Sequence, residues 1–137
     1  MVVSKQLPIA QVAEVLARRQ DVLFAYVFGS CARDEATAAS DLDVAIIGEG
    51  TFDPLELGAI VELLERATGK AVDVVDLRTA TPLLGWEVVC DGIVALDRDP
   101  AARLEFELEA QRRELDFRPL RLRQQELLRE AVRGRTA

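Results

Sequence analysis

Two aspartates that flank a leucine, Asp41 and Asp43, are the residues of this sequence best suited to chemistry. On an extended strand, side chains two residues apart share a face, with Cα atoms about 6.5–7 Å apart. Two carboxylates so placed repel each other unless a cation lies between them, and hard oxygen ligands suit Mg²⁺. The spacing therefore predicts a site for a pair of Mg²⁺ ions, with Leu42 pointing into the core.

A Gly-Ser pair precedes these aspartates, with ten residues between Ser30 and Asp41. Gly29 and Ser30 follow an apolar run, where we expect a strand to turn into a short helix. Such a turn presents free N–H groups, glycine lets the backbone approach an anion closely, and the serine hydroxyl can bind a phosphate oxygen. A Gly-Ser turn or an Asp-X-Asp pair alone is commonly structural. Together they predict a nucleoside triphosphate site.

A two-metal site needs a third carboxylate from a neighbouring strand, to complete the coordination or to take the proton of the nucleophile. Asp73 and Asp76 lie in a valine-rich run and are three residues apart, so they point to opposite faces and at most one can join the site. Asp73 lies in mid-strand, where a buried charge must be paired or bind metal. Asp76 lies at the strand's end, where it can cap a turn to Arg78. We favour Asp73 and keep Asp76 as the alternative.

The composition excludes other kinds of chemistry. The 137 residues include no histidine, which rules out Ser-His-Asp and Cys-His relays and histidine-bound zinc or haem. Cys31 and Cys90 lack metal-type spacing, and we interpret both as reduced residues of a cytoplasmic protein, with a Cys31–Cys90 disulfide as the alternative. The longest uncharged stretch, residues 22–32, is too short for a membrane span, and the first residues contain no secretory apolar segment. We therefore expect no membrane association.

The net charge of −7 is unevenly distributed. Residues 1–117 carry 11 basic and 22 acidic side chains, whereas residues 118–137 carry six arginines and two acidic side chains. The acidic balance argues against a nucleic-acid partner, and the basic segment lacks the interleaved aromatic residues of RNA-binding tails. Leucines recur among the arginines, so this segment predicts an amphipathic helix that packs on its own domain or docks on the acidic helical surface of a partner.

The elements that must position these residues alternate between strands and helices. Apolar runs predict strands at residues 21–28, 41–47, 71–77 and 92–96. Helical spacing and start signals predict helices at residues 8–19, 54–68, 82–90, 100–117 and 120–132, with a short helix or turn at 31–39. Pro119 should break or kink the long C-terminal helix. The pattern predicts one α/β domain at residues 1–99 and a helical extension at 100–137, packed on the domain or on a partner.

The Gly-Ser pair, the two aspartates and the later AVDVVDL strand resemble the minimal nucleotidyltransferases of the DNA-polymerase-β-type nucleotidyltransferase superfamily, over about residues 22–96. The sequence is most similar to the MNT subgroup, the antitoxin half of HEPN–MNT toxin–antitoxin pairs. The stretch WEVVCDGIVALDRDP at residues 86–100 is also similar. The resemblance implies a small mixed sheet flanked by helices, two Mg²⁺ ions, an NTP substrate and transfer of a nucleoside monophosphate to a hydroxyl, with loss of pyrophosphate.

Carried over by position, the resemblance implies roles for six residues. Gly29 and Ser30 would hold the triphosphate, with Arg33 beside them. Asp41 and Asp43 would ligate the metals, and Asp73 would be the third acid. Asp34 stands where family members usually have glycine.

The subgroup implies a partner as well as a reaction. It implies AMP transfer from ATP to a tyrosine of a cognate HEPN ribonuclease toxin, in a hetero-oligomer with that toxin. Two alternatives stay open. One is an enzyme that nucleotidylates a small molecule such as an aminoglycoside, and the other is a non-catalytic antitoxin that masks its toxin by binding.

Overall fold

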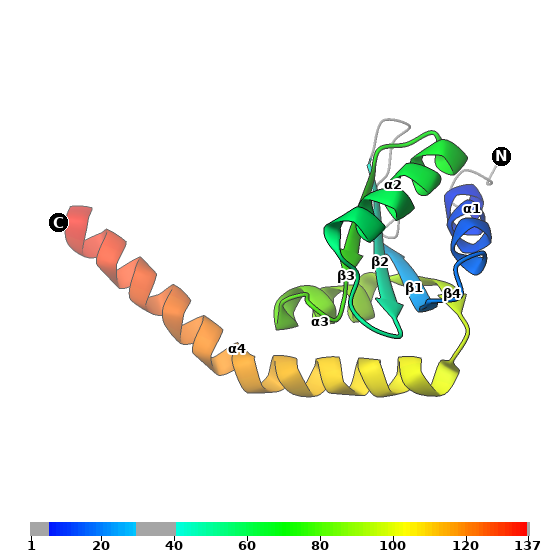
Figure 1. The fold of residues 1–137 in the computed structure, drawn as a ribbon. Helices are drawn as coiled ribbons and strands as arrows, with labels where there is room; N and C mark the ends of the chain where they lie inside the picture. Colours follow the sequence, from blue (N-terminus) through cyan, green and yellow to red (C-terminus); the bar gives the residue numbers. More distant parts are fainter. Residues whose placement is uncertain (1–5, 30–40, 137) are drawn as a thin grey trace.

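The computed structural model describes residues 6–29 and 41–136. Their elements follow the predicted order: α1 (Gln6–Ala17), β1 (Val22–Phe28), β2 (Leu42–Gly48), α2 (Pro54–Thr68), β3 (Val72–Asp76), α3 (Pro82–Asp91), β4 (Ile93–Asp97) and α4 (Pro100–Thr136) (Figure 1). The short helix or turn predicted at residues 31–39 lies outside the described residues, as do Ser30, Cys31 and Arg33.

The strands form one mixed sheet in the order β3-β2-β1-β4. β1 pairs antiparallel with β2 and with β4, and β2 pairs parallel with β3. A parallel pair needs a crossover connection, and α2 supplies it. The predicted fold, a small mixed sheet flanked by helices with a C-terminal helical extension, is confirmed.

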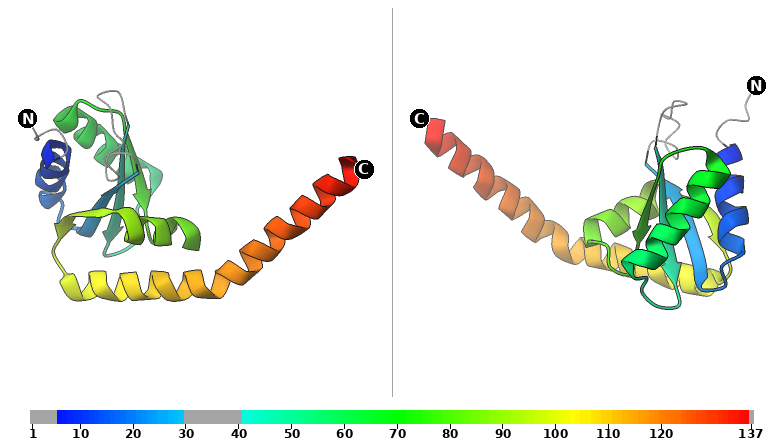
Figure 2. Two further views of the ribbon diagram at one scale, coloured as in Figure 1. Left: turned by 180° about the vertical axis from the view of Figure 1, so that it is seen from behind. Right: turned by 45° about the horizontal axis from the view of Figure 1, so that its top comes forward.

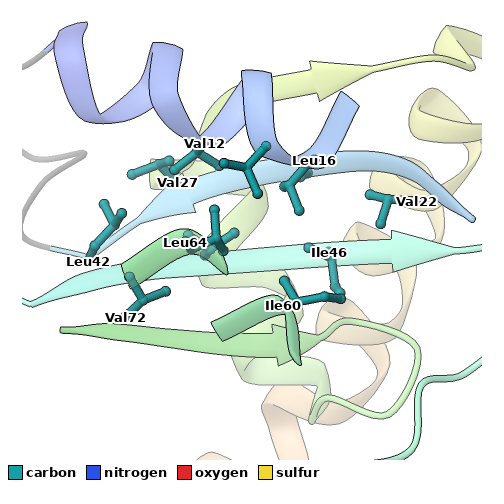
Figure 3. Packing of buried hydrophobic residues seen from close by; sticks show 12 residues of the cluster. Val12, Leu16, Val22, Val27, Leu42, Ile46, Ile60, Leu64 and Val72 are labelled. Carbon is teal, nitrogen blue, oxygen red and sulfur yellow. The ribbon is translucent and has the colours of Figure 1, made fainter. Parts of the chain in front are cut away.

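Helices cover both faces of this sheet (Figures 1 and 2). On one face, α1 and α2 pack over side chains that include Leu42, Val44 and Ile46 of β2 (Figure 3). The other face holds a second cluster, which includes Ala45 and Ile47 of the same strand and Val88 of α3. Because β2 is buried on both sides, its sequence is almost continuously apolar.

The ends of α2 are set by local hydrogen bonds. The Asp53 side chain accepts a hydrogen bond from the Glu56 N–H at 2.8 Å, and the Asp53 N–H donates to the Glu56 side chain at 3.2 Å. Gly69 ends the helix in the left-handed region, with φ of 68°. Asp53 is thus the N-cap of α2 and Gly69 its C-cap, and the chain passes from there to the start of β3.

The C-terminal region is a single helix, so the separate last helix predicted after Pro119 is wrong and the predicted kink is what occurs. Figure 1 shows the axis of α4 changing direction between its yellow and its orange-red part. Pro119 lies inside the helix and has no N–H for the carbonyl of Leu115, which accounts for the bend. Helix formation continues past Pro119 because the two sides are tied together. Glu114, nearly fully buried, accepts hydrogen bonds from Arg118 and from Arg121.

Polar contacts hold the first half of α4 to the sheet. The Tyr26 hydroxyl donates to Glu107 at 2.8 Å, and Arg103 donates to Glu107 at 2.8 Å and to Asp97 at 2.7 Å. Burial and the hydrogen bond to Glu107 raise the pKa of Tyr26 well above its usual value, so the phenol stays protonated and keeps donating. Among the described helices, α4 included, we find none with the length and apolar character needed to cross a bilayer.

Two adjacent leucines of α2, one buried and one exposed, allow the contribution of core packing to stability to be measured. Leu64 is fully buried, whereas Leu63 is 43% exposed. We expect Leu64→Ala to lower the free energy of unfolding by about 2–5 kcal/mol, because it removes buried methyl groups and leaves a cavity. Leu63→Ala, the matched control, should cost less than about 1 kcal/mol. Urea unfolding followed by circular dichroism measures both, and equal losses would contradict the described packing.

Candidate functional site

One end of the sheet gathers the aspartates that the sequence singled out. β1 ends there and β2 and β3 begin there, with Phe28 paired to Asp43 and Asp43 paired to Asp73. Register partners on neighbouring strands lie about 4.8 Å apart and point to the same face. That face is the one on which Ala45 and Ile47 meet α3. The fold therefore places the carboxylates of Asp43 and Asp73 side by side at the edge of that layer.

Backbone and side-chain hydrogen bonds fix this register. The Leu42 N–H donates to the carbonyl of Ala71 at 2.9 Å, and the Val72 N–H donates to the Glu65 carboxylate at 3.1 Å. Both bonds lie within a residue or two of the acidic pair. A one-residue slip would move Asp73 to the opposite face, so these bonds hold the two carboxylates on one face.

Gly29 has a specific steric reason to be glycine. Its φ is +73°, a conformation that side chains disfavour, and a Cβ built there would lie 2.3 Å from Oδ2 of Asp43. Glycine at this position therefore lets the Asp43 carboxylate lie against the backbone, where a Cβ would overlap it. Sequence reasoning chose Gly29 for its approach to a phosphate, and this contact with Asp43 is a feature that sequence reasoning missed.

Asp41 lies at the same end but outside the strand. It directly precedes β2 and is exposed, while Leu42 between the two aspartates is fully buried, as predicted. Over residues 6–29 and 41–136, no three acidic or cysteine side chains come close enough together to hold a metal. The backbone thus pairs Asp43 with Asp73 and puts Asp41 nearby, without drawing the three side chains together.

Asp76 has a structural position. It is 4% exposed, and its carboxylate accepts hydrogen bonds from the N–H groups of Phe52 and Arg78, each at 3.0 Å. Arg78 in turn donates to the carbonyl of Gly48 at 2.7 and 2.9 Å. The predicted turn cap is therefore present, and it lies at the far end of β3.

The burial argument used for Asp73 was wrong, because Asp73 is exposed and Asp76 is the buried carboxylate. The two do point to opposite faces, as the spacing predicted. The structure leaves Asp73 at the site end of β3, beside Asp43, and commits Asp76 to backbone groups elsewhere.

Two further residues complete the description of this region. Lys70, one of two lysines in the chain, directly precedes the Ala71–Val72 segment at the site end, and sequence reasoning did not single it out. A basic residue directly before an acid-bearing strand was the available signal. Cys90 is a free, exposed thiol of α3 whose pKa is raised by partial burial and by the nearby Asp91. Its proposed disulfide partner lies outside the described residues.

Comparison with known proteins identifies the family. The family model described as polymerase beta, nucleotidyltransferase, matches residues 10–101. The protein adenylyltransferase MntA of Shewanella oneidensis is 34% identical over 67 residues, a match that covers 49% of this chain and 48% of that protein. The chain thus spans about half the length of this curated relative.

Two solved structures share the fold over most of the chain. One is a toxin–antitoxin with AMP-PNP, with 22% identity and a TM-score of 0.76 over 90% of this chain and 98% of that one. Another is a tri-AMPylated Shewanella oneidensis HEPN toxin in complex with its MNT antitoxin, with 22% identity and a TM-score of 0.71 over 93% of this chain and 98% of that one. With the family model matching more than half of its residues, this chain belongs to the polymerase beta nucleotidyltransferase family.

Proposed function

We propose that this protein is a Mg²⁺-dependent protein adenylyltransferase that acts as an antitoxin, transferring AMP from ATP to a tyrosine hydroxyl of a cognate HEPN ribonuclease toxin. The observation that carries the proposal is the register pairing of Asp43 with Asp73 beside Gly29, within a chain of the nucleotidyltransferase family. The MntA match and the fold shared with HEPN–MNT complexes support the choice of reaction and partner.

The residues at this end of the sheet fit the metal that the proposal requires. Asp41, Asp43 and Asp73 offer only carboxylate oxygens, the donors that Mg²⁺ prefers. Gly29 lets the Asp43 carboxylate lie where a Cβ would displace it. Bound there, two Mg²⁺ ions would neutralise charge on the triphosphate and on the acceptor oxygen.

The chain's own residues would bind and orient the reactants. Gly29 and Ser30 hold the triphosphate through backbone N–H groups and a hydroxyl, with Arg33 adding a positive charge. Asp73 takes the proton of the tyrosine hydroxyl. The phenolic oxygen then forms a bond to the α-phosphorus of ATP, the bond from that phosphorus to the bridging oxygen breaks, and pyrophosphate leaves. Positioning and charge stabilisation supply most of the catalysis, so no histidine is required.

The cytoplasm is the compartment we propose for this reaction. ATP is abundant there, and the reducing conditions keep a free thiol such as Cys90 reduced. A tyrosine of a ribonuclease made in the same compartment would be accessible as soon as the toxin is synthesised.

Co-expression with the cognate toxin tests the proposal directly. We expect the toxin purified with the wild-type chain to gain the mass of one or more AMP groups by intact-mass spectrometry. The Asp41→Ala/Asp43→Ala variant should abolish the gain, because it removes two of the three proposed metal ligands. An unmodified toxin that is still bound and inhibited would favour masking without catalysis. Activity on aminoglycosides in the absence of any toxin would favour the small-molecule alternative.

The two aspartates of β3 give a matched pair of variants. We expect Asp73→Asn to slow Mg²⁺-dependent AMP transfer on the order of a hundredfold or more, because the amide cannot take the proton or ligate Mg²⁺ as a carboxylate does. Asp76→Asn should retain activity while the protein is folded and lose about 1–3 kcal/mol of stability through its weakened bonds to backbone N–H groups. The assignment fails if folded Asp76→Asn is inactive while Asp73→Asn is active. Transfer assays and thermal unfolding report the two effects separately.

Gly29 and Gly69 give a second matched pair, because both have positive φ. A Cβ at Gly29 would displace the Asp43 carboxylate, whereas a Cβ at Gly69 meets nothing within 4 Å. We expect Gly29→Ala to lose most AMP transfer. Gly69→Ala should keep its activity and lose about 1 kcal/mol of stability from backbone strain. Equal activities in the two folded variants would show that the reaction does not need the Asp43 carboxylate in its position against Gly29.

A further inference from the structure

The last part of α4, residues 120–134, extends away from the domain, and we call it the arm (Figures 1 and 2). Every residue of the arm is exposed except Arg121, which is half-buried against Glu114. In proteins, most of the stability of a helix comes from packing its apolar face on another surface. An arm that carries apolar side chains therefore needs another surface to cover it.

An apolar stripe runs along one side of the arm. Leu120, Leu127, Leu128 and Ala131 follow the i, i+7, i+8, i+11 spacing of a single helix face. The three leucines are 54%, 53% and 66% exposed. A shallow, mostly apolar depression lies at Leu127 and Leu128, while a polar one lies among Glu126, Arg129 and Glu130. The arm is thus two-sided, like a helix that packs on a protein.

The stripe continues the face by which α4 holds its own domain. Phe106 and Ala110 pack there in the first half of the helix, and steps of three or four residues lead from them to Leu128. In the first half this face lies against α3 and the sheet. Beyond Arg121 the described domain no longer reaches it.

Charge narrows the kind of protein that could cover the stripe. The segment 118–137 carries six arginines and two glutamates, whereas residues 1–117 have a net charge of −11. An acidic protein would be repelled by the domain and attracted by the arm. The occupant that fits is therefore an acidic protein with an apolar helical face.

The direction of the arm sets the side of the domain on which such a protein would lie. Figures 1 and 2 show the arm running outward from the domain on the side where β3, the strand that carries Asp73, forms the edge of the sheet. Glu114 maintains this direction through Arg118 and Arg121, on either side of Pro119. The hydrogen bonds from Arg121 and Arg118 hold the pKa of Glu114 below its usual value, so it stays charged at neutral pH.

We propose that the arm is the docking surface for the protein that accepts the nucleotide, with its leucine stripe on a helical face of that protein and its arginines against carboxylates there. This inference rests on the proposed adenylyltransferase function and adds to it the surface that selects the acceptor. It assigns selection of the acceptor to the arm and the chemistry to the end of the sheet. Changes in the arm should therefore alter KM for the acceptor and leave kcat unchanged.

The test compares two changes within the arm. Leu127→Gln/Leu128→Gln removes the stripe, and Leu122→Gln changes a leucine of similar exposure on the opposite face. Leucine and glutamine are both good helix formers, so helix content by circular dichroism should stay unchanged. A ribonuclease-inactive variant of the cognate HEPN toxin, with its acceptor tyrosine intact, serves as the probe.

We expect the double variant to bind this toxin at least tenfold more weakly in titration calorimetry, because docking would no longer remove the apolar surface of two leucine side chains from water. Its KM for the toxin should rise to a similar extent, with kcat and ATP affinity within about twofold of wild type. Leu122→Gln should match wild type in all four quantities.

Equal effects of the two variants, or unchanged binding by the double variant, would overturn the docking surface. A wild-type dimer in light scattering that the double variant dissolves would also overturn it, because a second copy would then cover the stripe. The proposed function fails independently of this inference. If wild type binds the toxin through the stripe but transfers no AMP, the docking surface stands and the adenylyltransferase proposal falls.

Discussion

The pairing of β2 with β3 is the constraint on which the rest of this structure depends. It sets Asp43 beside Asp73 on adjacent parallel strands, where two carboxylates repel each other and the backbone cannot separate them. Parallel pairing requires the α2 crossover, and the hydrogen bonds at Leu42 and Val72 keep the strands from slipping. Gly29 has no Cβ to push the Asp43 carboxylate out of this position. Together these features keep the carboxylates of Asp43 and Asp73 close to each other. A cation bound between them would relieve their repulsion.

The two ends of the sheet have opposite characters. At the far end, Asp76 accepts hydrogen bonds from two backbone N–H groups, and Arg78 donates to the carbonyl of Gly48. At the site end, Asp41 and Asp73 are exposed. One strand thus carries a structural carboxylate at its end and a solvent-facing one near its start. This division lets the fold stay rigid while its polar groups at one end remain accessible to substrates.

Much of the fold could be predicted from the sequence, because helix ends and strands depend on residues that are close together in the chain. Asp53 and Gly69 set the bounds of α2, and the apolar runs gave all four strands of the described chain. Strand order and register depend on pairing between distant segments, so spacing alone could not place Asp73 beside Asp43. The prediction rested on the need for a third carboxylate and on the family resemblance. The contact between Gly29 and Asp43 arises from pairing across β1 and β2 and had no local signal. The continuity of α4 through Pro119 was missed because Glu114 accepts a hydrogen bond from Arg121, which lies beyond the proline.

The place of β3 in the sheet has a consequence for solubility. In the described part of the chain β3 is an edge strand, and an exposed edge is a template on which strands of other molecules can add. Asp73 is exposed on this strand of five residues. A second copy that paired with this edge would bring two Asp73 carboxylates together or bury one of them. The charge therefore opposes edge-to-edge pairing between molecules. A residue that we place in catalysis would thus also keep a concentrated protein monodisperse.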